Sequence, residues 1–159
     1  MQSTSVLFNL GTGIQMLGLA LMIGGMLSIG AFAAPVIFKQ VARPEAGDIL
    51  TTIFRRYDKV LVIALIFVVL GEAFRVLSVQ TAWTTLPLVR EVVLVVTVLL
   101  LAYSLFGVNA KLEAMHKAGV GYGATAEGQE FLKVHKLSES LFKTEMMGAV
   151  IIMLLTPFV

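Results

Sequence analysis

Two charged residues, Glu72 and Arg75, interrupt a long apolar stretch of the chain, in the sequence VVLGEAFRVLSV. They are three residues apart, so a helix would place them on one face. A second pair of opposite charges, Arg90 and Glu91, follows at the start of the next apolar stretch. Ionisable side chains inside a membrane are costly, and they normally pair or mark the path of a proton or ion. The pattern therefore indicates either an ionic clasp between helices or an ion pathway.

The short connection QTAWTT separates the two charged pairs. A hairpin folded there would bring both pairs to a similar depth. We expect Glu72 to meet Arg90, and Arg75 to meet either Glu91 or Glu72. Because the four formal charges cancel, we favour a structural clasp, with snorkelling of the long arginine side chains toward the interface.

Methionines are the second group of residues with possible chemistry. Met22 and Met26 share one helix face, and Met146, Met147 and Met153 lie near the end of the chain. Thioethers suit Cu(I), but methionine is also a common filler of apolar cores. The chain has no cysteine and no histidine within its apolar stretches to complete a copper site. We therefore expect these methionines to be filler.

The two histidines, His116 and His135, fall outside the apolar stretches, and neither has a carboxylate at a metal-ligand spacing. We expect His135 to make hydrogen bonds at the membrane interface, and we predict no metal or haem site and no cofactor. The chain has no catalytic Ser-His-Asp pattern and no G-x-S-x-G sequence, so we predict that it is not an enzyme. No basic cluster with interleaved aromatics suggests nucleic acid as a partner.

The elements that position these residues follow from composition. The chain has 159 residues, of which 58% are hydrophobic and 14% charged, whereas soluble domains have about 45–50% and about 25%. Four apolar segments are long enough to cross a bilayer, and backbone groups in lipid must be satisfied within each segment, which requires helices. We predict an all-α, integral membrane four-helix bundle that forms one domain over 1–159, with spans at about 10–38, 57–79, 86–108 and 137–158.

The orientation follows from the basic residues, because cytoplasmic loops carry an excess of Lys and Arg. Ten of the twelve fall in or beside two connections: Lys39, Arg43, Arg55, Arg56, Lys59, Lys111, Lys117, Lys133, Lys136 and Lys143. We predict cytoplasmic loops at 39–56 and 109–136 and both termini on the non-cytoplasmic side. The membrane would be a bacterial-type inner membrane or a topologically equivalent internal one.

Two glycine-containing features complete the pattern. The segment KAGVGYGATAEG predicts a solvated hinge, after which an amphipathic extension of the last helix begins near Ala126. In the first span, small residues recur at helical spacing, and Gly148 stands in the fourth; such residues let helix backbones approach closely in lipid. We expect them to pack inside one bundle, with a dimer seam as the alternative. The residues of this set are Ala20, Gly24, Gly25, Ser28 and Gly148.

The sequence GLALMIGGMLSIGAFAAPVIFKQVARPEAGDILTTIFRRYDKV resembles the DUF4149 family, which includes transmembrane protein 205. The matching features are the small residues of the first span, an A-P-x-x-F-K turn with Pro35 and Phe38, and an R-x-x-A-G sequence from Arg43 to Gly47. The resemblance implies a four-helix integral membrane protein and implies no reaction. A more distant likeness is to four-helix copper-resistance and haem-pathway membrane proteins.

The second half of the chain carries the resemblance in FLKVHKLSESLF, where His135 and Ser138 match the entry of the family into its last helix. The family often has an asparagine one turn after this serine, where the present chain has Phe142.

From these observations we predict a non-enzymatic membrane protein, an accessory, assembly or scaffold subunit of a larger membrane complex. Its partners would be the lipid bilayer and either other membrane subunits or further copies of itself. The alternative is a small transporter or resistance protein for metal ions or protons, and a haem-binding redox protein is a third hypothesis.

Overall fold

The computed structural model describes residues 2–78 and 85–158, and these residues form four long helical rods with no strand among them. The predicted all-α architecture is therefore confirmed. The first rod is α1 (Gln2–Leu27), η1 (Ser28–Ala33) and α2 (Ala34–Gln40), and the second is α3 (Arg43–Ser78). The third is α4 (Thr85–Tyr103), η2 (Ser104–Asn109) and α5 (Ala110–Lys117), and the fourth is α6 (Ala126–Leu155) with η3 (Thr156–Phe158).

Each rod contains a stretch that is long and apolar enough to cross a membrane. With a rise of about 1.5 Å per residue, the 36 residues of α3 extend well beyond a hydrocarbon core of about 30 Å. The chain is a multi-pass integral membrane protein, and its lipid-facing surface is apolar.

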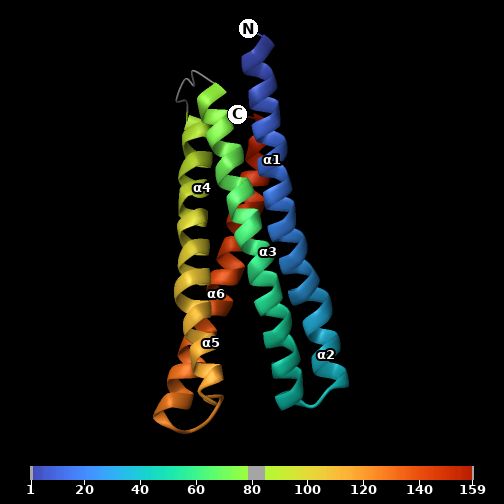
Figure 1. Cartoon of the computed structure of the whole chain (residues 1–159), viewed down its shortest axis with the longest axis vertical. Helices are drawn as coiled ribbons and strands as arrows, with labels where there is room; N and C mark the ends of the chain where they lie inside the picture. Colours follow the sequence, from blue (N-terminus) through green and yellow to red (C-terminus); the bar gives the residue numbers. More distant parts are fainter. Residues whose placement is uncertain (1, 79–84, 159) are drawn as a thin grey trace.

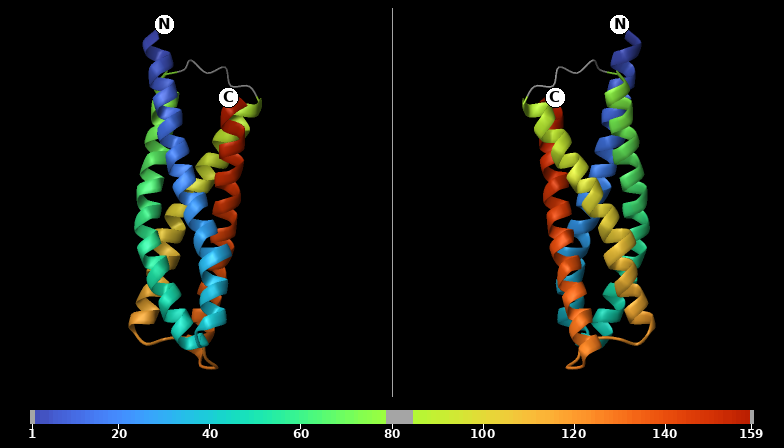
Figure 2. Two further views of the ribbon diagram at one scale, coloured as in Figure 1. Left: turned by 90° about the vertical axis from the view of Figure 1, so that its right-hand side faces the viewer. Right: turned by 90° about the vertical axis from the view of Figure 1, so that its left-hand side faces the viewer.

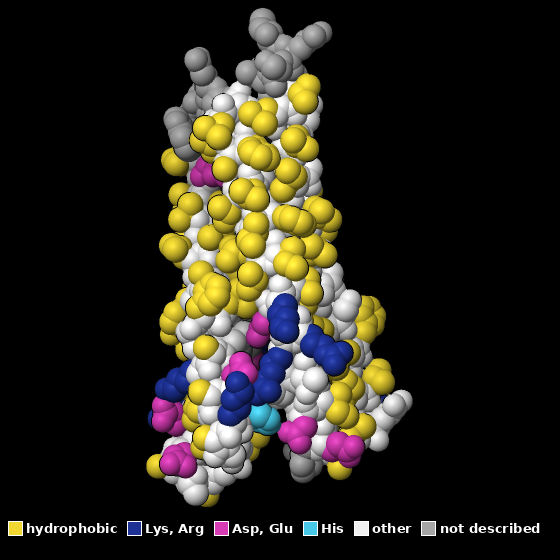
Figure 3. Space-filling view, viewed as in Figure 1, with side chains coloured by type: hydrophobic (Ala, Val, Ile, Leu, Met, Phe, Trp, Pro, Cys, Tyr) yellow, Lys and Arg dark blue, Asp and Glu magenta, His cyan; other side chains and the backbone are white. Residues whose placement is uncertain are grey.

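The rods run side by side, with α1 packed mainly on α3 and α4 on α6 (Figures 1 and 2). Both termini lie at one end of the bundle, here called the terminal end. The connections between α2 and α3 and between α5 and α6 lie at the other end, called the loop end. Charged side chains gather near the loop end, while most of the visible face above them is apolar (Figure 3). Which end faces the cytoplasm remains a prediction from the basic residues.

The helices continue past the predicted spans. Of the segment 39–56, which was expected as a loop, the part from Arg43 onward belongs to α3, and α5 reaches Lys117. The hydropathy pattern marks only where a helix leaves the lipid, whereas hydrogen bonding within the backbone carries it further. The fourth rod begins at Ala126, as its amphipathic pattern predicted, and the Thr125 side chain accepts a hydrogen bond from the Gly128 amide (3.1 Å). This N-cap satisfies one of the free amides of the first turn.

Pro35 lies within a continuous helix and does not end it. A proline ring clashes with the carbonyl four residues earlier and offers no N–H to it. The preceding segment η1 is a wider π-helix, in which the Ala34 amide bonds to the Ile29 carbonyl five residues back. The wider turn accommodates the proline, so the first rod continues to Gln40.

Glycine sets the distance between α1 and α3. A Cβ atom added at Gly18 would lie 2.7 Å from the backbone carbonyl oxygen of Ala64, and one at Gly71 would lie 2.5 Å from the backbone nitrogen of Gln15. Gly11 faces Gly71 in the same way. Backbone therefore meets backbone along this seam, which is the contact that small residues permit in lipid.

Three of the small residues expected to pack inside the bundle do not. Ala20, Gly24 and Ser28 are exposed, and a Cβ added at Gly24 would have no neighbour within 4 Å. The prediction of packing within the bundle was wrong for them, because they lie on an outer face of the first rod, away from the glycines that meet α3.

The other two small residues leave room for larger side chains. A Cβ at Gly25 would lie 2.1 Å from the ring of Tyr57, whose hydroxyl donates to the Met22 carbonyl (2.6 Å). A Cβ at Gly148 would lie 2.1 Å from the hydroxyl oxygen of the buried Thr97. Both glycines thus fit helices together inside the bundle.

The apolar core runs between the rods and contains two of the three methionines of α1. Met22 and Met26 are buried with Leu61, Leu101 and Ile152. In α6, Met146 packs against this core, whereas Met147 and Met153 are exposed on the outer surface of the bundle.

Candidate functional site

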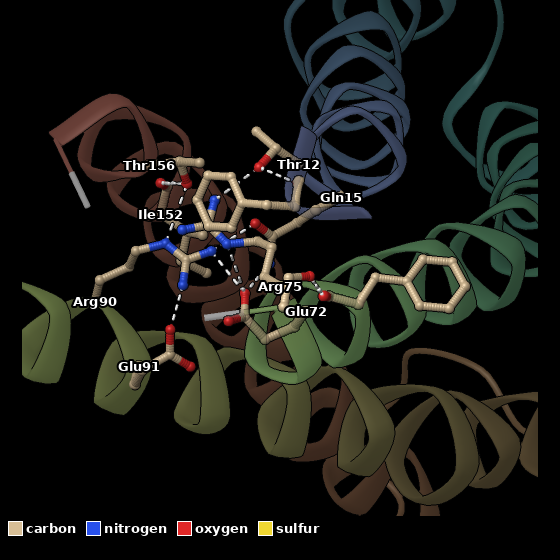
Figure 4. A network of polar contacts seen from close by, with 11 residues as sticks. Thr12, Gln15, Glu72, Arg75, Arg90, Glu91, Ile152 and Thr156 are labelled. Atoms are coloured by element: carbon tan, nitrogen blue, oxygen red, sulfur yellow. Dashed lines mark hydrogen bonds and ion pairs between the residues drawn. The ribbon is translucent and has the colours of Figure 1, made fainter. Parts of the chain in front are cut away.

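A fully buried guanidinium, that of Arg90, joins all four rods near the terminal end (Figure 4). Its Nη2 donates to Gln15 Oε1 of α1 (2.5 Å) and to Glu72 Oε2 of α3 (2.7 Å). Its Nε donates to the Thr156 hydroxyl at the end of the fourth rod (3.2 Å), and its Nη1 donates to Glu91 of α4. Every nitrogen of this side chain therefore has an acceptor.

The carboxylate of Glu72 is the matching acceptor. Its Oε2 receives the Gln15 amide (2.6 Å) as well as Arg90, and the Arg75 Nε lies 3.8 Å away. Gln15 therefore both donates to the carboxylate and accepts from the guanidinium, which fixes the orientation of its amide. The close approach of α1 to α3 at Gly71 allows the short glutamine side chain to reach both partners.

Arg75 extends the cluster toward the first helix. Its Nη1 donates to the Thr12 hydroxyl (3.2 Å), and its guanidinium carbon lies 4.7 Å from the centre of the Phe8 ring. A cation over an aromatic face is attracted by the ring quadrupole, more strongly where water is excluded. Arg75 is 5% exposed, so these contacts replace most of its hydration.

The structure brings together the four charged residues singled out in the sequence. Glu72 meets Arg90, Arg75 lies beside Glu72 rather than Glu91, and Glu91 pairs with Arg90. Sequence reasoning missed the uncharged members of the cluster, Gln15, Thr12 and Thr156. Gln15 offered a clue, because it is an amide within an apolar helix, at a depth where a buried polar group needs a partner.

The charged side chains of this cluster pair with one another. Two carboxylates and two guanidiniums cancel, and the short bonds in Figure 4 run between residues of the cluster itself. A buried ion pair contributes little on its own, whereas breaking one leaves an uncompensated charge. The geometry supports holding the rods in register, and we keep the name terminal cluster for Thr12, Gln15, Glu72, Arg75, Arg90, Glu91 and Thr156.

A second set of polar residues lies between the rods nearer the loop end. Asn109 of η2 donates to Asp58 of α3 (3.1 Å) and accepts from Ser138 of α6 (3.1 Å). Ser138, one of the residues singled out by the family resemblance, thus takes part in a contact among three rods. Phe142, in place of the family asparagine, packs edge-on against Phe54 with ring centres 6.0 Å apart.

Deeper on the same side is Glu145 of α6, which sequence reasoning did not single out. It is 1% exposed, and its Oε1 has no hydrogen-bond partner. The buried Ser104 of η2 lies next to its carboxyl group, and Tyr57 and Asp58 of α3 are close enough to interact with it electrostatically. Its sequence position after Lys143 resembles that of an ordinary interfacial charge, so no pattern distinguished it.

The remaining residues matched to the family have separate positions. Pro35 and Phe38 lie in α2, Arg43 begins α3, and Gly47 follows in its next turn without a close neighbour. His135 of α6 lies 3.3 Å from Glu139. These positions do not converge on one site.

The two histidines have different neighbours. His116 lies 4.0 Å from Asp48, and His135 stacks on Phe131 with ring centres 6.2 Å apart. Across residues 2–78 and 85–158, no group of three or more His, Asp or Glu side chains is arranged to hold a metal ion.

Comparison with known proteins agrees with this architecture. Residues 17–120 match the family model described as a domain of unknown function, DUF4149. The chain therefore belongs to the DUF4149 family. It matches no curated protein and no solved structure.

Proposed function

We propose that this DUF4149 protein is a non-enzymatic accessory subunit that binds a helix of another membrane subunit and so assembles or stabilises a larger complex. The observation that carries the proposal is the outward face of the first rod. There Ala20 and Gly24 of α1 and Ser28, the first residue of η1, form an exposed strip of small residues, here called the α1 strip.

The first support is the unequal covering of the four rods. In the first, 17% of the most apolar stretch is buried, against 28–33% in the others. Lipid tails are as apolar as leucine, so helix association in a membrane depends on close packing of small residues. The α1 strip provides such a surface on the least covered rod.

The second support is the closed terminal cluster. Its charged side chains form ion pairs with one another, so its geometry favours a structural role over an ion pathway. An ion pathway requires a group that gives up its partner to the passing ion, whereas Arg90 is held from all four rods at once.

Purification in a gentle detergent, followed by identification of co-purifying chains, tests the proposal. The decisive variant is Gly24→Leu, which adds bulk to the α1 strip where the bundle itself has open space. The matched control is Val95→Phe, which adds bulk to an exposed position of α4.

We expect a defined partner chain to co-purify with the native protein and the control, and to be lost with Gly24→Leu while the variant stays folded. A native protein that purifies as a lone monomer from its own membrane would overturn the proposal. A partner retained by Gly24→Leu would place the interface elsewhere and overturn the role of the α1 strip. Recovery of only a second copy of this chain would replace the accessory role with a homo-oligomer.

A further inference from the structure

One buried carboxyl group of the bundle, that of Glu145, does not belong to the terminal cluster. Glu145 lies in the apolar part of α6 and is 1% exposed, and its Oε1 has no hydrogen-bond partner. Among the residues that the structure describes, no Lys, Arg or His side chain forms an ion pair with it. An ionised carboxylate without a partner in a medium of low dielectric is very costly, and such a group takes up a proton instead.

The titratable groups close to Glu145 strengthen this preference. Asp58 and Tyr57 of α3 are the titratable groups close enough to act on it, and neither supplies positive charge. From η2 the Ser104 hydroxyl is a hydrogen-bond partner for the carboxyl group, whereas Oε1 is left without one. Neither α1 nor η2 contains a charged residue in its sequence, so these elements cannot neutralise a carboxylate.

Polar residues continue from Glu145 toward the loop end on α6, in η2 and on α3. On α6, Ser138 lies seven residues closer to that end, or about two helical turns. In η2, Asn109 lies five residues beyond Ser104 in the same direction. Asn109 then joins Ser138 to Asp58 through hydrogen bonds of 3.1 Å, and all three are partly exposed.

The local backbone is also unusual at this point. Ser104 and Asn109 are the first and last residues of the π-helical segment η2. Such wide turns are rare, and they frequently occur at functional sites because they redirect side chains. Here the segment presents these two polar side chains to the inside of the bundle, and its other four residues are Leu, Phe, Gly and Val.

We propose that Glu145 is a proton-binding site, held as the neutral acid and exchanging its proton with water at the loop end of the bundle. In release, the O–H bond of the carboxylic acid breaks and the proton passes to a water molecule. The electron pair stays on the carboxylate, and uptake is the reverse. This inference is independent of the accessory role, since it concerns the inside of the bundle and not the α1 strip.

Labelling of the native protein with dicyclohexylcarbodiimide tests the resting state. This apolar reagent enters lipid and adds to protonated carboxyl groups, and the adduct rearranges to a stable N-acylurea. In lipid nanodiscs near neutral pH, peptide mass spectrometry should locate the adduct on Glu145 and not on the exposed Glu139 of the same helix. Labelling should fall as pH is raised. No adduct on Glu145 at any pH at which the protein stays folded would overturn the proposal.

Infrared spectroscopy supplies a second, independent measurement. The native protein should show a carbonyl stretching band of a protonated carboxylic acid, which Glu145→Gln should remove and Glu139→Gln should retain. Mixing with D2O should shift the band, because the site exchanges with water. A band that survives in Glu145→Gln, or that does not shift in D2O over hours, would refute the site or its exchange. If Glu145→Gln fails to fold, the labelling of the native chain still decides.

Discussion

Replacement of Arg90 and Glu72 by glutamine, singly and together, tests the terminal cluster most directly. Each variant removes one charge; Glu72→Gln keeps the shape of the side chain, whereas Arg90→Gln shortens it. Because Arg90 is fully buried and binds groups from all four rods, we expect Arg90→Gln to lower the free energy of unfolding and to loosen every pair of rods at this depth.

The two single changes should differ in size. Breaking a buried ion pair typically costs about 3–5 kcal/mol. Arg90→Gln removes the ion-pair partner of Glu91 and one partner of Glu72, so two carboxylates lose their strongest contact. Glu72→Gln leaves Arg90 paired with Glu91 and leaves Arg75 its bond to Thr12. We therefore expect Arg90→Gln near the upper end of that range and Glu72→Gln near the lower end.

The double variant restores neutrality between the two positions. Residues in direct contact show interaction energies of about 0.5–3 kcal/mol in double-mutant cycles, so its loss should be smaller than the sum of the single losses by an amount in that range. The measurement is equilibrium unfolding in mixed micelles, followed by circular dichroism and supported by thermal midpoints.

An exposed ion pair provides the matched control. Lys111 and Glu130 lie 2.5 Å apart at the loop end, with side chains 51% and 55% exposed. Exposed pairs contribute little despite short distances, so the corresponding cycle there should show almost no coupling. Additive losses at Glu72 and Arg90, or a larger loss for Glu72→Gln than for Arg90→Gln, would refute the reasoning.

Three further predictions concern packing, orientation and the methionines. Gly25→Ala should lower the unfolding free energy by about 1–3 kcal/mol, because its Cβ would overlap the Tyr57 ring, whereas Gly24→Ala, in open space, should leave thermal stability equal or slightly higher. In this cysteine-free chain, Thr85→Cys should react with an impermeant thiol reagent on intact cells and Gly121→Cys should not; the reverse would invert the orientation. Replacing Met22 and Met26 with leucine should lower the free energy of unfolding by less than about 1.5 kcal/mol and should leave the metal content of the purified protein unchanged. Loss of stoichiometric Cu(I) on this double change would contradict their role as apolar filler.

The four rods could be predicted from sequence because lipid imposes a strong local rule. A segment of about 20 apolar residues must satisfy its own backbone, so length and hydropathy identify it without knowledge of the other segments. The same rule stops at the interface. Hydropathy therefore did not predict that α3 begins as early as Arg43 or that the third rod continues to Lys117.

The face on which α1 packs could not be read from its own sequence. Small residues recur on two faces: Gly11, Gly18 and Gly25 at intervals of seven, and the α1 strip at intervals of four. Either face could form a close seam. The choice depends on the partner, since Gly71 and its neighbours on α3 admit the first set, and no property of α1 alone reveals this.

Buried polar partners were the hardest part to predict. Charges inside an apolar stretch stand out, so Glu72 and Arg90 were found, but Gln15 and Thr156 are ordinary residues until the guanidinium reaches them. Glu145 was hidden by its position near Lys143, and its inward direction depends on the rotation of α6 against its neighbours. Local sequence contains neither the register nor the rotation of a helix.

The two buried polar regions differ in a way that bears on function. An ionic cluster stabilises a bundle most when every buried polar group has a hydrogen-bond partner. Each nitrogen of Arg90 has such a partner, and these partners come from all four rods. An exchange site needs the opposite: a group that the protein leaves incomplete, as the unpartnered Oε1 of Glu145 is. A buried carboxyl group with one oxygen left unpartnered costs free energy, so this group does not stabilise the bundle as the terminal cluster does. The terminal cluster is thus explained by the stability of the bundle, whereas the incomplete bonding of Glu145 supports the proposed exchange of its proton.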